Sequence, residues 1–194
     1  MLVTEVKTTD QELVAASLAD RQIYSQIVNR YQAALARYVR RLGCTDEDDV
    51  QDVLQQVFLK AYVNLNGYDP ALKFSSWLYR ICHNETISFF RRANIRPKAP
   101  TTEDEAQLVA AIADERDLTL ILDQNLTREK VQLAIAALPE KYREVVVLKY
   151  LEDKSYEEIS DILQKPLGTI ATLLNRAKNR LRQEFGARGL DKIL

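Results

Sequence analysis

The sequence has few of the residues that separate many short strands, since its 194 residues include 5 glycines and 5 prolines. A barrel or sandwich is therefore excluded, and an all-helical chain is the natural alternative. The two cysteines, Cys44 and Cys82, follow no repeated spacing, which predicts buried free thiols in a reducing compartment rather than a disulfide framework. No apolar run approaches the roughly 18 residues of a membrane span, and the first residues lack the segments of a signal peptide. We therefore expect a cytoplasmic protein that does not contact a membrane.

Signs of catalysis are equally scarce. The single histidine, His83, cannot build a multi-histidine metal site, and the chain has no Ser-His-Asp arrangement, glycine-rich phosphate loop or CxxC pair. We therefore expect no metal, no cofactor and no enzymatic activity. With 46% hydrophobic and 28% charged residues, the chain has enough apolar material for a real core, so the question becomes what it binds.

The net charge of −1 conceals three unlike segments. Residues 1–97 carry 12 basic and 11 acidic groups, residues 98–127 carry 2 and 7, and residues 128–194 carry 13 and 10, together the 27 and 28 of the whole chain. Pro97 and Pro100 disfavour helix at the start of the acidic segment. The sequence therefore predicts an all-α protein of two small helical domains, 1–96 and 128–194, joined by a flexible acidic linker at 97–127.

Helical periodicity fills the first half of the chain. Apolar residues recur at intervals of three and four over 11–42, with a break near Ala19, and Gly43 is expected to end that run. The same spacing continues over 50–62 and predicts another amphipathic helix. An acidic run at 46–52 precedes that helix and suits the positive end of its dipole.

Aromatic and guanidinium side chains are mixed in the next helix, expected over about 75–92 with Ser75 as its cap. The turn residues of 64–73 place that segment outside the helices. Aromatic faces beside arginines suit single-stranded nucleic acid. Aromatic side chains at helical spacing can equally form a core, and the residues alone leave both interpretations open.

The second half of the chain predicts a helix-turn-helix. Pro139 can begin a helix, and Ser155 with Glu158 forms the pattern of a capping box. A short helix over 156–163, a tight break and a longer basic helix over 167–185 should follow. In a helix-turn-helix the second helix enters the major groove of DNA, whereas a generic helical hairpin would have the same pattern.

The segments DVLQQVFLKAY and KFSSWLYRICHNETISFFRR resemble region 2 of the extracytoplasmic-function group of bacterial sigma factors. The resemblance implies that the first segment docks on the clamp helices of the largest subunit of core RNA polymerase. The loop and the second segment would open and read the minus-ten promoter element, as duplex and as melted single strand. The polymerase-binding residues implied are Asp52, Gln55, Gln56 and Phe58, and the minus-ten residues are Tyr68, Lys73, Ser75, Ser76, Trp77, Arg80, Asn84, Arg91 and Arg92.

The segments SYEEISDIL and PLGTIATLLNRAKNRLR resemble region 4 of the same group, in the expected order. This implies binding to the flap of the second-largest polymerase subunit and to the minus-35 element. Family members usually carry Lys and Arg at the positions of Ala171 and Leu173, so we expect weak minus-35 reading and dependence on minus-ten recognition or on a recruiting protein. The minus-35 residues implied are Thr169, Ala171, Thr172, Asn175, Arg176, Lys178 and Arg180.

Two other functions remain open at this point. An autonomous helix-turn-helix regulator would bind DNA through 128–194 and use 1–97 as a sensor or dimer domain. An enzyme acting on nucleic acid would need a carboxylate site, for which the acidic run at 46–52 is the candidate. The resemblance favours a sigma factor that directs core polymerase to promoters and promotes strand opening without covalent chemistry of its own. An anti-sigma factor is a further expected partner.

Overall fold

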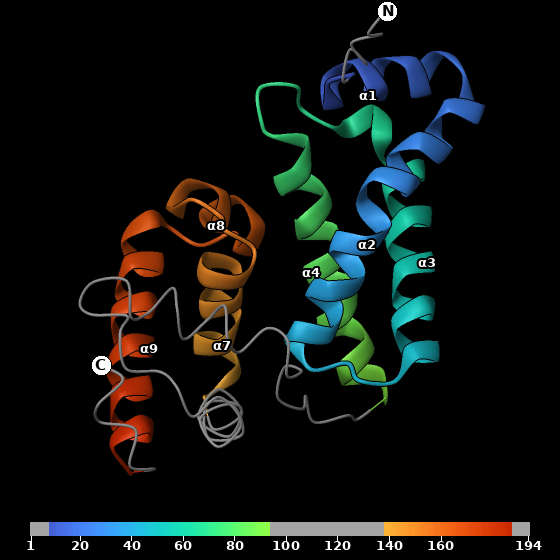
Figure 1. Ribbon diagram of the computed structural model, residues 1–194. Coiled ribbons are helices and arrows are strands. Elements are labelled where there is room, and N and C mark those ends of the chain that lie inside the picture. Colours follow the sequence, from blue (N-terminus) through green and yellow to red (C-terminus); the bar gives the residue numbers. More distant parts are fainter. Residues whose placement is uncertain (1–7, 94–137, 188–194) are drawn as a thin grey trace, which may run out of the picture.

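The structure is a computed structural model that describes residues 8–93 and 138–187, with side chains as far as 183. Every regular element in these ranges is a helix, as predicted (Figure 1). The N-terminal domain contains α1 (Asp10–Ala19), η1 (Arg21–Ile23), α2 (Tyr24–Leu42), α3 (Glu47–Val63), η2 (Leu65–Gly67) and α4 (Phe74–Ala93). The C-terminal domain contains α7 (Glu140–Val146), η3 (Val147–Leu151), α8 (Tyr156–Leu163) and α9 (Leu167–Ala187). The expected linker lies outside the described residues.

Local signals in the sequence set the ends of the first three helices. Thr9 and Glu12 form a capping box at the start of α1, which ends at Ala19 as predicted. Gly43 ends α2 with a φ of 116°, a left-handed conformation that favours glycine. The Asp46 carboxylate accepts hydrogen bonds from two backbone N–H groups in the first turn of α3, so the acidic run caps this helix.

Helix α4 corrects the prediction for Ser75. The helix begins at Phe74, and the Trp77 N–H donates to the Lys73 carbonyl at 3.2 Å, so Ser75 lies inside the first turn and is not the cap. The loop before α4 is only partly outside the bundle. Leu65 and Tyr68 are buried, and the Tyr68 hydroxyl donates to the Leu72 carbonyl at 2.6 Å.

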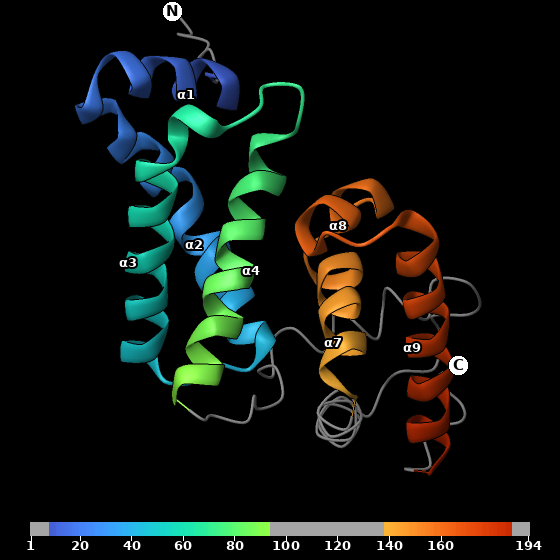
Figure 2. The same ribbon diagram turned by 180° about the vertical axis from the view of Figure 1, so that it is seen from behind.

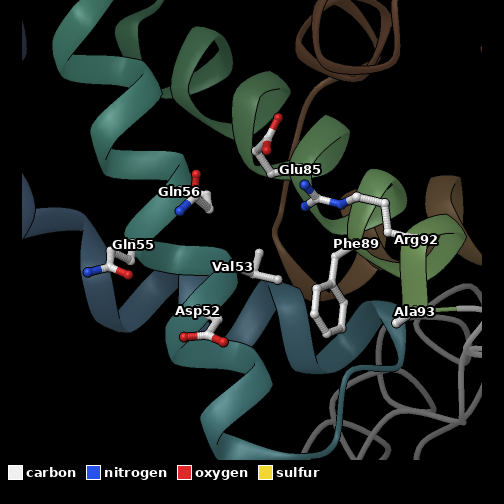
Figure 3. A pocket seen from close by; sticks show the side chains of 8 residues that line it. All are labelled: Asp52, Val53, Gln55, Gln56, Glu85, Phe89, Arg92 and Ala93. Atoms are coloured by element: carbon white, nitrogen blue, oxygen red, sulfur yellow. The ribbon is translucent and has the colours of Figure 1, made fainter.

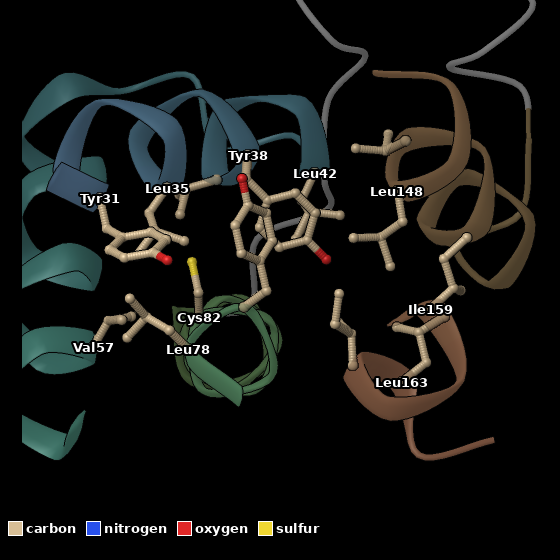
Figure 4. Packing of buried hydrophobic residues seen from close by; sticks show 14 of the residues in the cluster. Tyr31, Leu35, Tyr38, Leu42, Val57, Leu78, Cys82, Leu148, Ile159 and Leu163 are labelled. Carbon is tan, nitrogen blue, oxygen red and sulfur yellow. The ribbon is translucent and has the colours of Figure 1, made fainter. Parts of the chain in front are cut away.

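Helices α2, α3 and α4 all contact one another and enclose the core of the N-terminal domain. Leu35 and Tyr38 of α2 and Leu78 of α4 are fully buried there (Figure 4). Burial of side chains of this size stabilises the fold by about 1.5–3 kcal/mol each.

The C-terminal domain has the predicted helix-turn-helix. Ser155 and Glu158 form a capping box at the start of α8, and Gln164 ends α8 in a left-handed conformation with a φ of 52°. The helix that follows Pro139 changes to a π-helical turn at 147–151, which periodicity did not predict. None of the helices in the two described ranges is both long and apolar enough to cross a membrane.

The two domains pack against each other, with α8 lying beside α4 (Figure 2). Apolar side chains of both domains join one buried cluster. Figure 4 shows Tyr38 and Leu42 of α2 facing Leu148, Ile159 and Leu163 of the C-terminal domain. The flexible linker expected from the sequence predicts two separate helical domains, and the contact between them was not predicted.

Candidate nucleic-acid and partner interface

One face of α3 presents the polar residues that the resemblance assigned to polymerase binding. Asp52, Gln55 and Gln56 are exposed, whereas Phe58 is half-buried and packs against the core. The Phe58 carbonyl accepts a hydrogen bond from the buried Tyr24 hydroxyl at 2.7 Å. Phe58 therefore supports the position of this face, and the three polar side chains are available to a partner.

A cavity of about 630 Å³ lies between this face and α4 (Figure 3). Asp52, Gln55 and Gln56 line it from α3, and Phe89 and Arg92 line it from α4. With Glu85, three charged groups and two amides surround an aromatic ring, which suits a partner that offers both polar and apolar groups. The structure thus brings the three exposed polymerase-binding predictions next to Arg92, a predicted minus-ten residue.

A second cavity, of about 470 Å³, lies nearer the start of α4. Trp77 and Asn84 line it, and so do Lys60 and Asn64 at the end of α3. The exposed Asn84 amide offers hydrogen bonding, and the buried Trp77 forms an apolar wall beside it, a combination that suits an unstacked base.

Glu85 lines both cavities and is the important residue that the sequence reading missed. Its carboxylate is 8% exposed and accepts from the Lys60 ammonium at 2.5 Å. Glu85 was visible only as the single acid of a basic helix, and its partner lies 25 residues earlier. The signal available in the sequence was one acidic residue among basic ones, and the fold shows that this residue is buried.

Leu59 and Val63 were also missed. Both lie on α3, and their exposed fractions are 55% and 67%. They follow Asp52 and Gln56 at helical spacing and extend the polar face with apolar surface. The sequence did carry a signal: both residues are apolar, yet they lie outside the apolar stripe that this helix buries.

The predicted minus-ten residues divide by burial. Tyr68, Ser76 and Trp77 are buried, and the Trp77 ring contacts Tyr68 and Phe74 at centroid distances of 5.6 and 5.5 Å. These three residues, which were predicted to contact DNA, therefore also pack in the core of the domain. Ser75 and Arg80 are half-buried, and the exposed members of the set are Lys73, Asn84, Arg91 and Arg92.

Most of the predicted minus-35 residues line the outside of α9. Lys178 is half-buried, with its ammonium 5.9 Å from the centre of the Tyr150 ring. Leu173 is half-buried against the core, so its position is partly structural, whereas Ala171 is open to solvent. The exposed members are Thr169, Ala171, Thr172, Asn175, Arg176 and Arg180.

Burial keeps the two cysteines and the histidine of the core in their neutral forms. Burial raises the pKa of the Cys82 thiol far above its usual range and raises that of Cys44 to about 11. Burial lowers the pKa of His83 to about 4, and its Nδ1 lies 3.1 Å from the Tyr38 hydroxyl. Within residues 8–93 and 138–187, no three side chains of the metal-binding types come together.

Comparison with known proteins identifies both domains. The family model described as Sigma-70 region 2 matches residues 27–95, and that described as Sigma-70, region 4 matches residues 128–181. The ECF RNA polymerase sigma factor SigW of Bacillus subtilis is 34% identical over an alignment of 174 residues that covers 86% of this chain and 90% of SigW. The ECF RNA polymerase sigma-E factor of Escherichia coli K12 is 32% identical over an alignment of 179 residues that covers 89% of this chain and 92% of that one.

Two solved structures share the fold. The structure of CnrH in complex with the cytosolic domain of CnrY matches with a TM-score of 0.66 at 24% identity and covers 92% of this chain and 97% of the other. The sigma factor RpoE in complex with the anti-sigma factor NepR, from Bartonella quintana, matches with a TM-score of 0.60 at 20% identity and covers 84% and 96%.

Proposed function

The chain belongs to the extracytoplasmic-function sigma factors, and from that premise we propose which surfaces it uses to direct RNA polymerase to promoters. Residues 1–96 bind core polymerase and the minus-ten element, and residues 128–194 bind the polymerase flap and the minus-35 element. Residues 97–127 connect them. The chain acts in the cytoplasm and performs no covalent chemistry itself, since the polymerase supplies the active site.

The α3 face binds the clamp helices of the largest polymerase subunit. Asp52, Gln55 and Gln56 supply polar contacts, and the exposed Leu59 and Val63 supply apolar area on the same face. Interfaces commonly combine a small apolar centre with such a polar rim. Phe58 fixes the backbone through its packing and through the hydrogen bond from Tyr24.

The second cavity receives a base of the melted minus-ten strand. Asn84 donates to or accepts from the edge of the base, and Trp77 forms the apolar wall of the cavity that holds it. The buried Tyr68 and Ser76 and the half-buried Ser75 hold the loop and the start of α4 in place. Phosphate contacts come from the remaining basic members of the predicted set, Lys73, Arg80, Arg91 and Arg92.

The α9 surface reads the minus-35 element weakly. Thr169, Thr172, Asn175 and Arg176 are available to base edges, and Lys178 and Arg180 to phosphates, but Ala171 offers no polar group. The chain consequently relies on the minus-ten element, or on a recruiting protein. An anti-sigma factor is a further partner, as in the Bartonella quintana complex with NepR.

One observation carries this proposal: the exposed residues assigned to polymerase and those assigned to the minus-ten element line two adjacent cavities that share Glu85. The test is binding to core polymerase and promoter-dependent transcription by the double variant Asp52→Ala, Gln55→Ala. We expect both to be lost while the thermal unfolding curve is unchanged, because these side chains are exposed. Gln32→Ala, an exposed glutamine on α2, is the control and should keep both activities. Unchanged polymerase binding by the double variant would contradict the assignment.

A further inference from the structure

A buried ion pair joins the two domains. The Arg41 guanidinium of α2 donates from Nη1 to Glu152 Oε1 at 2.6 Å, and these side chains are 6% and 5% exposed. The same Nη1 donates to the Leu151 carbonyl at 2.5 Å. The Tyr79 hydroxyl of α4 donates to Glu152 Oε2 at 2.7 Å. Each oxygen of the Glu152 carboxylate therefore accepts from a different helix of the N-terminal domain.

The C-terminal domain presents these acceptors through an unusual local structure. The π-helical turn η3 ends at Leu151, and the Glu152 N–H donates to the Val147 carbonyl at 3.0 Å. Asp153 then adopts a positive φ of 49°. Lys154 places its ammonium 4.3 Å from the centre of the Tyr79 ring, so the contact continues past the turn. We call Arg41, Tyr79 and Glu152 the interdomain contact.

Two longer polar contacts flank it. His83 Nε2 of α4 lies 3.7 Å from Glu144 Oε1 of α7. Lys73 Nζ lies 3.4 Å from Glu158 Oε1 at the start of α8. Lys73 is also one of the residues assigned to minus-ten DNA, so closing the domains engages a group that DNA would need.

Dimensions show that the closed chain cannot use both DNA-binding surfaces together. The centres of elements at minus-ten and minus-35 are about 25 base pairs apart, which is about 85 Å of B-form DNA. From α3 through α4 and α8 to α9 there are three packed helix pairs, or about 30 Å at 8–10 Å per pair. The 20 and 21 residues of α4 and α9 make each about 30 Å long. Two surfaces of this closed molecule are thus at most about 40 Å apart, half the span required.

We propose that the interdomain contact is an autoinhibitory device that holds the free chain closed and must break before the chain engages a promoter. This inference rests on the proposed function. Removing the Glu152 charge leaves the Arg41 guanidinium buried at the interface without its carboxylate, which destabilises the closed state, whereas in the open state both side chains are solvated. The apparent affinity for polymerase and promoter is therefore reduced by the fraction of chains that are open.

The closed state can be trapped by a zero-length carbodiimide, which condenses the Lys73 ammonium with the Glu158 carboxylate into an amide with loss of water. Mass spectrometry of the digested, full-length chain then measures the linked peptide pair. The test variant is Glu152→Gln, which keeps the volume and removes the charge. Glu47→Gln is the matched control, because Glu47 pairs with Arg40 within the N-terminal domain at 2.7 Å. Tyr79→Phe, which removes one hydroxyl, serves as a second variant if Glu152→Gln unfolds.

We expect the link in free wild-type chain and in Glu47→Gln, and its loss when core polymerase and promoter are added. In Glu152→Gln the closed-to-open ratio should fall at least about tenfold. The concentration of this variant that gives half-maximal transcription should fall as well. Absence of the link from the free chain, its persistence in the promoter complex, or an unchanged half-maximal concentration would each overturn the proposal. Wild-type chain that stimulates transcription at no concentration would instead refute the proposed function, while the link would still report the closed state.

Discussion

At the scale of residues, burial separates side chains that can touch a partner from those that hold them in place. Asn84 is exposed at the rim of the second cavity, whereas Trp77 forms its wall while it packs on Phe74 and Tyr68. A pattern of residue types could place both in one functional segment. It could not say which of them is free, because that depends on the loop that folds over Trp77.

Asn84→Ala should relax base choice at the minus-ten element. Loss of an amide that hydrogen-bonds a base should reduce discrimination at one promoter position by about 1–3 kcal/mol, the size of one good side-chain contact to a base. Stability should change by less than about 0.5 kcal/mol, because the side chain is exposed. Transcription from promoters substituted at each minus-ten position measures this effect. Asn29→Ala, on the exposed side of α2, should leave base choice intact; a uniform loss at all positions would argue against a base contact.

Ala171→Lys should strengthen binding to promoter DNA. Ala171 is exposed on α9, so a lysine there can reach a phosphate without disturbing the core, unlike a substitution at the half-buried Leu173. One added phosphate contact should steepen the salt dependence, with a slope of log affinity on log salt more negative by about 0.9. Binding of the polymerase complex to a promoter at several salt concentrations measures the slope. Ala15→Lys adds the same charge to α1 and should leave it unchanged. Equal slopes for the two variants would contradict the proposal that the small side chain of Ala171 weakens minus-35 binding.

At the scale of elements, the sequence predicted most of the helices, because their ends carry local signals. The capping box at Ser155, the break at Ala19 and the left-handed Gly43 are all confirmed. The start of α4 was wrong by one residue, since Ser75 has the chemistry of a cap but lies inside the first turn. The π-helical turn at 147–151 was not predictable, because its residues continue the apolar pattern of an ordinary helix.

Ser155→Ala should destabilise α8 and with it the helix-turn-helix. The hydroxyl accepts from the Glu158 N–H at 3.2 Å, and the Glu158 carboxylate accepts from the Ser155 N–H at 2.9 Å. Loss of the hydroxyl should lower the free energy of unfolding by about 1 kcal/mol. Denaturant titration followed by circular dichroism measures the change. Ser155→Asp keeps an acceptor oxygen and should retain most of the stability; equal losses in the two variants would show that the cap contributes little.

At the scale of the whole molecule, the packing of one domain on the other could not be predicted. Arg41 and Glu152 are 111 residues apart, and no periodicity relates them. Each looks like a solvated charge in its own segment. Their pairing arises only because α8 lies on α4 and places the end of η3 over α2. The helical content thus follows from local patterns, whereas the contacts that determine access to DNA depend on tertiary geometry.

The domain interface should also make stability depend on pH through Glu144. Burial raises the pKa of Glu144 from 4.5 to about 7, although the Lys165 ammonium, 3.9 Å away, opposes this. Below pH 4.5 the carboxyl is protonated in both folded and unfolded chains. As the pH rises toward 7 the unfolded chain gives up this proton while the folded chain keeps it, so the stability contributed by Glu144 is lost. His83 has the opposite sign, because its lowered pKa removes stability as the pH falls from 6.5 to about 4.

Comparison with Glu144→Gln isolates the carboxyl, because both proteins keep His83. The free energy of unfolding of wild type should fall relative to that of Glu144→Gln between pH 4.5 and 7. The expected fall is about 2 kcal/mol, because each tenfold change in proton affinity corresponds to about 1.4 kcal/mol. Urea titrations at several pH values in this range measure the difference. Glu157→Gln, in which an exposed carboxylate of α8 is replaced, should show no such divergence from wild type. If the difference in the free energy of unfolding between wild type and Glu144→Gln stayed constant, Glu144 would be ionised in the folded chain. The protein loses stability over this range only if the carboxyl keeps its proton when folded and releases it when unfolded.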